Sequence, residues 1–167
     1  MSCKGYPIIA TEIFYERSLE NHPLMQVTTI EYQDYLITTD KSRMHVHEVH
    51  KWLSEQSYWC NGVSFEKVTT AFDNSFCIAA FSGSNQIAFA RLITDYSSFG
   101  YLADVYVLEE YRGKGICKAM MKVLLEIDWV RQLRGLMLAT RDAHGLYRQF
   151  GFTELPNPER YMKLNSQ

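Results

Sequence analysis

The sequence has few cysteines, little excess charge and no long apolar run, and each of these shortages argues against a class of protein. Its four cysteines lie far apart without a Cys-x-x-Cys pair, which argues against a disulfide framework and favours reduced thiols in the cytoplasm. Seventeen basic and nineteen acidic residues give a net charge of −2, which removes the electrostatic case for non-specific nucleic-acid binding and leaves open only a local basic patch. No apolar run approaches the roughly 20 residues that a membrane helix needs, and no secretory signal is evident at the N-terminus. We therefore expect a cytoplasmic protein with neither a nucleic-acid nor a membrane partner.

The length and composition fit a single domain. A chain of 167 residues, 47% hydrophobic and 22% charged, can bury a substantial core. No internal repeat, low-complexity tract or Pro/Gly-rich linker divides it. We predict an N-terminal extension over residues 1–34, whose role the sequence does not reveal, and one domain over residues 35–167.

Apolar patterning and turn residues predict strands interspersed with helices. The clearest helix follows residue 115, where apolar residues recur every three or four positions from Ile116 to Ile127. Strands are expected over residues 26–38 with a turn at 33–34, and over 75–81, 86–94, 100–107, 136–139 and 161–164. The other helices are expected over residues 45–56, 65–72 and 143–150. This order predicts a fold of the α/β or α+β class, a sheet flanked by helices.

The segment 104–118 is the most informative part of the chain. A strand ends there, a basic turn with glycines follows, and the amphipathic helix begins at once. Backbone N–H groups at such a helix start lack intrahelical partners and favour an anion, especially a pyrophosphate. Gly113 and Gly115 would let the backbone approach it closely. Three nearby side chains add positive charge: Arg112, Lys114 and Lys118. The alternative is an ordinary helix start with solvated charges.

Two better-known phosphate loops do not fit this turn. A P-loop needs Gly-x-x-x-x-Gly-Lys-Ser/Thr, which is not found here. A dinucleotide-binding fingerprint needs Gly-x-Gly-x-x-Gly, but its third glycine position is held by Lys118, which is too large for close helix–strand packing.

Two motifs in this sequence resemble those of the GNAT superfamily of acyl-CoA-dependent N-acyltransferases. Arg112-x-x-Gly115-x-Cys117 follows the superfamily signature Q/R-x-x-G-x-G/A, with cysteine in place of the last small residue. Residues 143–152 follow its A-x-x-L-Y-x-x-x-G-F segment. The resemblance covers roughly residues 35–164. Longer strings, such as 101–105 and 140–147, are similar to a bacterial subgroup of that superfamily without a settled acceptor.

The resemblance implies a GNAT-like mixed, mostly antiparallel sheet that opens between the strand ending at Val107 and the strand at 136–139. Acetyl-CoA would be the co-substrate, with its pantetheine arm in that opening and its pyrophosphate on the turn. Two departures are a Glu109 where proline is common and the lack of an asparagine that often touches pantetheine. The cofactor-binding residues expected from the resemblance are Val105, Tyr106, Val107, Arg112, Gly113, Lys114, Gly115, Ile116, Cys117 and Lys118.

The resemblance also places Tyr147 near the thioester sulfur as the general acid that protonates the departing thiolate. A phenol with an ordinary pKa of about 10 can donate as negative charge builds on the sulfur. The alternative is a helix tyrosine whose ring packs in the core and whose hydroxyl reaches the surface.

Asp104 is the candidate base. On a regularly alternating strand it would share a face with Leu102 and Tyr106, and an acidic residue in an apolar strand is costly unless it is hydrogen-bonded or reaches a cleft. It could bind the acceptor ammonium or take its proton. Equally, it could be a structural carboxylate held by backbone or by a side chain such as His144 or Arg141.

Two further candidates carry less weight. His47 and His50 are three residues apart, but they do not form the His-Glu-x-x-His pattern, so a solvated helix face is favoured over a metal site. Cys117 lies at a helix start, where thiol pKa values fall, yet a bound pyrophosphate would occupy the same place. We expect no metal.

The resulting hypothesis is an N-acetyltransferase that moves an acetyl group from acetyl-CoA directly to a primary amine in a ternary complex. The acceptor could be a small molecule or a protein amine. The alternative is an acyl-CoA-binding sensor or regulatory module without turnover. Edge strands of the sheet favour a homodimer.

Overall fold

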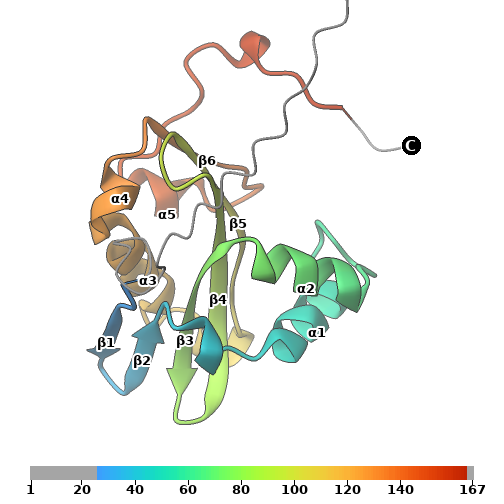
Figure 1. Cartoon of the computed structure of the whole chain (residues 1–167), viewed down its shortest axis with the longest axis vertical. Coiled ribbons are helices and arrows are strands. Elements are labelled where there is room, and N and C mark those ends of the chain that lie inside the picture. The colour runs from blue at the N-terminus through green and yellow to red at the C-terminus, as the bar shows by residue number, and fades with distance from the viewer. Residues whose placement is uncertain (1–25, 165–167) are drawn as a thin grey trace, which may run out of the picture.

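The computed structural model describes residues 26–164, which form one mixed sheet with helices on both faces (Figure 1). Neighbouring strands are antiparallel except for the parallel pair β5–β6. The strands, in their order across the sheet, are β1 (Thr29–Tyr32), β2 (Tyr35–Thr38), β3 (Phe76–Ser82), β4 (Asn85–Thr94), β5 (Phe99–Val107) and β6 (Gly135–Leu138). The expected mixed, mostly antiparallel sheet is confirmed.

Four of the five α-helices lie close to their predicted positions, and the short helix α4 was not predicted. The helices are α1 (Val46–Gln56), α2 (Phe65–Asp73), α3 (Ile116–Glu126), α4 (Asp128–Arg131) and α5 (His144–Arg148), with 3-10 turns η3 (Lys41–Arg43), η4 (Glu109–Tyr111) and η5 (Pro158–Arg160). Local chemistry explains the boundaries. The Ser64 hydroxyl caps α2 by accepting a hydrogen bond from the Lys67 N–H, and Gly151, at φ +85°, follows α5. Among the described residues, no helix has the length and apolar character that a membrane span requires.

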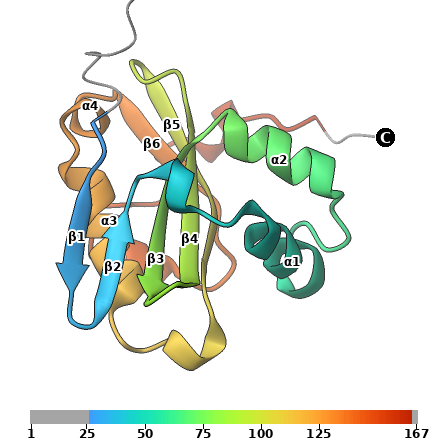
Figure 2. The ribbon, with the colours of Figure 1, turned by 60° about the horizontal axis from the view of Figure 1, so that its bottom comes forward.

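The sheet separates two hydrophobic cores. On one face, the apolar stripe of α3 packs with α5 against the sheet, and residues such as Ile116, Met120 and Leu124 are fully buried. On the other face, α1 and α2 pack against β3 and β4 around Trp52 and Phe89. Figures 1 and 2 show α1 and α2 together on one side of the sheet, with α3 on the other. Both faces of the central strands are therefore covered.

Strands β5 and β6 separate after a short paired stretch. Their register runs from Phe99–Gly135 to Leu102–Leu138, and β6 ends there while β5 continues to Val107. The last residues of β5 thus have no strand partner on that side within residues 26–164. The opening expected between these two strands is confirmed.

The ends of the described chain differ from the sequence-based expectations. The predicted strand at residues 161–164 is wrong, because this segment pairs with no strand of the described structure and has no regular secondary structure after η5. At the other end, β1 precedes the predicted domain boundary at residue 34 and is paired with β2. The sheet therefore begins on the N-terminal side of that boundary. Residues 1–25 lie outside the described part.

Candidate active site

The turn before α3 presents a run of free backbone donors. Gly113 and Gly115 adopt positive φ values of 76° and 80°, which favour glycine. The first amide of the helix with a backbone acceptor is that of Ala119, bonded to the Gly115 carbonyl at 2.9 Å. Among the described residues, the six N–H groups from Gly113 to Lys118 have no acceptor. They form a cradle suited to an anion.

The two glycines of this turn face different surroundings. A Cβ on Gly113 would meet open space, whereas a Cβ on Gly115 would overlap the hydroxyl of Tyr32 on β1. A side chain at residue 115 would therefore force the Tyr32 hydroxyl to move, in addition to straining the left-handed backbone, whereas Gly113 borders the open side. The guanidinium of Arg112 donates through Nε to the Val107 carbonyl at 3.2 Å, which ties the turn to the end of β5.

A bulge in β5 changes which face each residue presents. Arg91 pairs with Ala103 and Phe89 with Tyr106, so two residues of β5 lie opposite one residue of β4. Asp104 lies at this bulge with φ +52°. Consequently Leu102 packs on the α3 side, whereas Tyr106 packs on the α1 side. The prediction that Leu102 shares a face with Tyr106 is wrong, because the bulge shifts the alternation.

Asp104 is held by side chains from two other parts of the chain. Its Oδ2 accepts a hydrogen bond from Arg91 Nε at 2.5 Å, and its Oδ1 accepts one from Trp59 Nε1 at 3.0 Å. Arg91 also donates to the Ser75 hydroxyl at 3.2 Å. The suggested partners His144 and Arg141 are wrong. Asp104 and Arg91 also line a cavity of about 240 Å³ between the sheet and the helices α1 and α2.

Tyr147 combines a buried ring with a hydroxyl that is free of protein hydrogen bonds. The residue is 7% exposed and its ring packs edge-on against Phe152, with centroids 5.7 Å apart. Within the described residues, its hydroxyl makes no hydrogen bond. The hydroxyl is also not one of the fully buried polar atoms without a partner. Burial raises the pKa of Tyr147 above its ordinary value, with smaller contributions from Cys117 and Tyr58. The phenol is therefore protonated at neutral pH.

Cys117 differs from its expected chemistry. Burial raises the pKa of this thiol to about 11, so the prediction of a lowered value at the helix start is wrong. The cause is desolvation, because burial disfavours the charged thiolate. Cys117 is therefore a packing residue beneath the turn.

The histidines of α1 pack against an aromatic ring. The His47 ring stacks on Phe65 with centroids 4.4 Å apart, and His50 Nε2 lies 3.1 Å from the Val63 carbonyl. Over residues 26–164, no group of three His, Cys, Asp or Glu side chains is arranged to hold a metal ion.

The Acetyltransferase (GNAT) family model matches residues 46–152, which include the α1–α2 region, the turn and α5. This chain belongs to the GNAT acetyltransferase family. It is 39% identical to a GNAT protein of Xanthomonas campestris pv. campestris, with a TM-score of 0.77 over 79% of this chain and 93% of that chain. It is also 29% identical to a protein of Gibberella zeae assigned as an acetyltransferase, over 68% of this chain and 76% of that protein.

The likeness to a more distant structure shows the fold alone. The acetyltransferase of Clostridium acetobutylicum, whose structure was solved with acetyl-CoA, is 16% identical. The two align with a TM-score of 0.61 over 84% of this chain and 96% of that chain.

Three residues of this GNAT domain were not identified from the sequence. Arg91 and Trp59 hold Asp104, and Tyr58 stacks under the Arg141 guanidinium, 3.9 Å from the ring centroid. Arg91 carried a usable signal: like Asp104, it is a charge inside an otherwise apolar strand. Two such charges of opposite sign on adjacent strands favour an ion pair. The two aromatic residues lie in the loop between α1 and α2 and carried no comparable pattern.

Proposed function

We propose that this protein transfers an acetyl group from acetyl-CoA to a primary amine by direct transfer in a ternary complex. The observation that carries the proposal is the cradle of six free N–H groups, Gly113 to Lys118, beside the end of β5, which has no strand partner on the β6 side. Membership of the GNAT family supports acetyl transfer, and the structure solved with acetyl-CoA supports this donor. The amine acceptor and the ternary complex are inferences from the site.

The residues of the turn fit the pyrophosphate of acetyl-CoA. Gly113 leaves the approach open, and the start of α3 adds the positive end of the helix dipole. Residues Val105 to Val107 have no strand partner on the β6 side, where their backbone groups are available to the pantetheine arm. Ile116 and Cys117 pack beneath. Acetyl-CoA would supply an acetyl group already activated as a thioester.

Tyr147 is the proposed proton donor for the leaving thiolate. Its phenol is protonated at neutral pH, and its hydroxyl is not committed to another described residue. Burial disfavours both a phenolate and a thiolate, so a raised phenol pKa does not by itself abolish the driving force for transfer to sulfur. The buried ring would fix the position of the hydroxyl, so the core and catalytic roles are compatible.

Asp104 is proposed to give the acceptor-binding side of the site its shape and its negative charge. Both of its oxygens already accept hydrogen bonds, so removing a proton from an amine would require one of these bonds to open. Its side chain is 11% exposed and lines the cavity against α1 and α2. We therefore favour a role in positioning the acceptor over a role as general base.

An amine-panel assay that follows free thiol released from acetyl-CoA tests this function. The panel includes small amines, amino acids and peptides with a free lysine or N-terminus. We expect amine-dependent thiol release, which the matched Tyr147→Phe variant should lose while still binding CoA. CoA binding without amine-dependent release across the panel would favour the sensor, and no CoA binding would overturn both functions.

A further inference from the structure

The loop between α1 and α2 holds two exposed aromatic rings beside Asp104. Tyr58 and Trp59 are 53% and 42% exposed, and their rings meet edge-on with centroids 4.9 Å apart. The Trp59 ring also packs on Trp52 of α1, and its Nε1 donates to the Asp104 carboxylate at 3.0 Å. Trp59 is therefore anchored on both sides, and it holds Tyr58 at the surface close to the acidic residue of β5.

A guanidinium stacks on the Tyr58 ring. The Arg141 Cζ lies 3.9 Å from the centroid of this ring, within the range of a cation–π contact. A guanidinium that stacks by its face keeps the N–H donors at its edge for another partner. Among residues 26–164, Arg141 is paired with one acid, Asp142 at 3.6 Å, and both side chains are mostly exposed, so this pair is weak. Arg141 is thus held in place while its donors remain available.

Arg141 lies close to the proposed reaction centre and on its acceptor side. The loop that carries Arg141 leads into α5, the helix of Tyr147. The Tyr58 ring beneath Arg141 is also near enough to Tyr147 to contribute to its raised pKa. Tyr58 and Trp59 come from the α1–α2 side, which Asp104 also faces. By contrast, the cradle is backbone at the start of α3, on the opposite side of the sheet (Figure 1).

The charges on the acceptor side are unequally balanced. Asp104 has the Arg91 guanidinium 2.5 Å away, so these two opposite charges largely cancel. Among the described residues, Arg141 has only the weaker contact with Asp142, and it is the less compensated of the two arginines. A carboxylate has two oxygens that match the paired N–H donors of a guanidinium. The acceptor side therefore offers a binding place for a carboxylate at Arg141.

We propose that the amine acceptor carries a carboxylate, which Arg141 binds while the amine reaches the acetyl group beside Tyr147. The proposal rests on the proposed function and narrows its acceptor from any primary amine to small amino-carboxylates. The amine nitrogen forms the amide bond as the C–S bond breaks. The nitrogen loses one proton and the thiolate gains one, while the carboxylate is unchanged. Tyr58 is a positioning residue, because it acts only by holding Arg141.

The first test compares linear amino acids with their amides as acceptors. The series runs from glycine to ε-aminocaproate, and each amide keeps the shape of its parent without the negative charge. For at least one length, the ratio of kcat/KM between acid and amide should fall about tenfold in Arg141→Gln, the low end for a hydrogen bond to a charged group. CoA affinity should stay the same. Comparing the ratios of wild type and variant cancels the difference in amine pKa within each pair.

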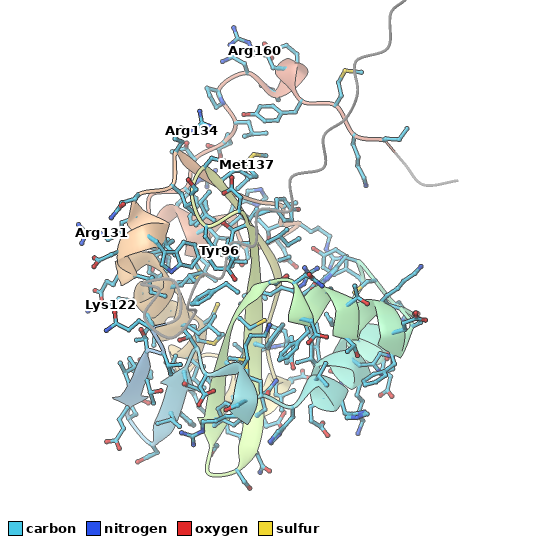
Figure 3. The ribbon with its side chains drawn as sticks, viewed as in Figure 1. Tyr96, Lys122, Arg131, Arg134, Met137 and Arg160 are labelled. Atoms are coloured by element: carbon cyan, nitrogen blue, oxygen red, sulfur yellow. The ribbon has the colours of Figure 1, made fainter. Side chains whose placement is uncertain are left out.

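Arg131→Gln is the matched control, because it removes the same charge from α4. Figure 3 shows Arg131 at the outer side of α4, across the body from α1 and α2. Its ratio should equal that of the wild type. An unchanged ratio in Arg141→Gln would overturn the proposal, as would a loss of CoA affinity, which would assign Arg141 to the donor. A wild-type preference for a phosphonate over the carboxylate of the same length would overturn the carboxylate assignment.

Further variants separate the stack from the charge. Tyr58→Phe keeps the ring under Arg141 and should keep the ratio, whereas Tyr58→Leu removes the ring face and should lower it. Asp142→Asn removes the competing acid and should raise the ratio. Added salt should lower the ratio in wild type, because the contact is exposed to solvent. Equal ratios in Tyr58→Phe and Tyr58→Leu would remove Tyr58 from its positioning role.

A binding test separates this proposal from acetyl transfer itself. The Nε–H signal of Arg141, identified by its loss in Arg141→Gln, is followed by ¹⁵N NMR in the full chain with saturating CoA. Acids of the series should shift this signal, and their amides should not. A shift without any acetylation would support the carboxylate site and refute the proposed transfer. Acetylation of other amines without a shift from any acid of the series would refute the carboxylate site alone.

Discussion

The two sides of the candidate active site are built from different materials. The donor side is backbone: one continuous segment, 113–118, supplies every free N–H of the cradle. The acceptor side is made of side chains, because Asp104 is held by Arg91 from β4 and by Trp59, which is 45 positions away in the sequence. A local site of the first kind leaves a signature in the spacing of glycines. A site of the second kind depends on which distant side chains the fold brings together.

The largest expected effect is at Tyr147, which we place between the two sides. Tyr147→Phe keeps the buried ring and should lower kcat by about 10²–10⁴-fold, the usual contribution of a general acid. CoA affinity and stability should change little, because the hydroxyl makes no hydrogen bond within the described residues. Steady-state kinetics on a confirmed acceptor, together with CoA titration, measure both. The loss should shrink with a donor whose thiol is more acidic, and wild-type kcat would assign Tyr147 to the core alone.

A smaller effect on turnover, with a cost in stability, is expected at the Asp104–Arg91 pair. Asp104→Asn removes the charge opposite a mostly buried guanidinium, and should lower the free energy of unfolding by about 2 kcal/mol, somewhat below the cost of breaking a fully buried pair. The acceptor KM should rise, while CoA affinity stays the same because the donor side is separate. Chemical denaturation and kinetics measure the two effects. A stable variant whose lost transfer recovers at high pH would instead make Asp104 the base.

The glycines of the turn offer a sharper comparison within the donor side. Gly115→Ala should lower the free energy of unfolding by about 1–2 kcal/mol, because residue 115 has a left-handed backbone conformation. Overlap of the new Cβ with the Tyr32 hydroxyl should lower it further. Gly113→Ala carries only the backbone cost, because its Cβ meets open space. Adding Tyr32→Phe should restore part of the stability of Gly115→Ala and none of that of Gly113→Ala. Thermal denaturation of the two single glycine variants, the two double variants and Tyr32→Phe alone tests this, and equal rescue would remove Tyr32 from the turn.

The smallest effect is expected at Cys117. A folded-state pKa of about 11 keeps the Cys117 thiol protonated at pH 8. At that pH, Cys117 should therefore be alkylated much more slowly than a free thiol of pKa about 8.5. The rate should rise only as the pH approaches 11, while the fold persists. Mass spectrometry of iodoacetamide-treated protein gives the site-specific rate. Rapid modification at pH 8 would show that the helix start outweighs burial.

Local periodicity predicted most of the fold. The stripe from Ile116 to Leu124 and the turn at Gln33-Asp34 are encoded within a few residues, and both are found as expected. The segment 161–164 shows the limit of such reasoning. Its alternating pattern is typical of a strand, but a strand also needs a partner, and the described structure provides none for it.

The candidate site could be predicted only on its backbone side. The cradle follows from Gly113 and Gly115 before an amphipathic helix, whereas the face of Asp104 depends on a bulge opposite Ala90 that the alternating pattern does not reveal. The raised pKa of Cys117 likewise depends on burial by the surrounding core rather than on its place at a helix start.

The most direct test of the backbone cradle is amide exchange at Gly113 to Lys118, measured by NMR with and without CoA. These N–H groups lack acceptors in the described structure, so they should exchange quickly in the free protein and become strongly protected when CoA binds. Adenosine, which has no pyrophosphate, should leave them unprotected. CoA binding that protects other amides but leaves these six unchanged would contradict the account.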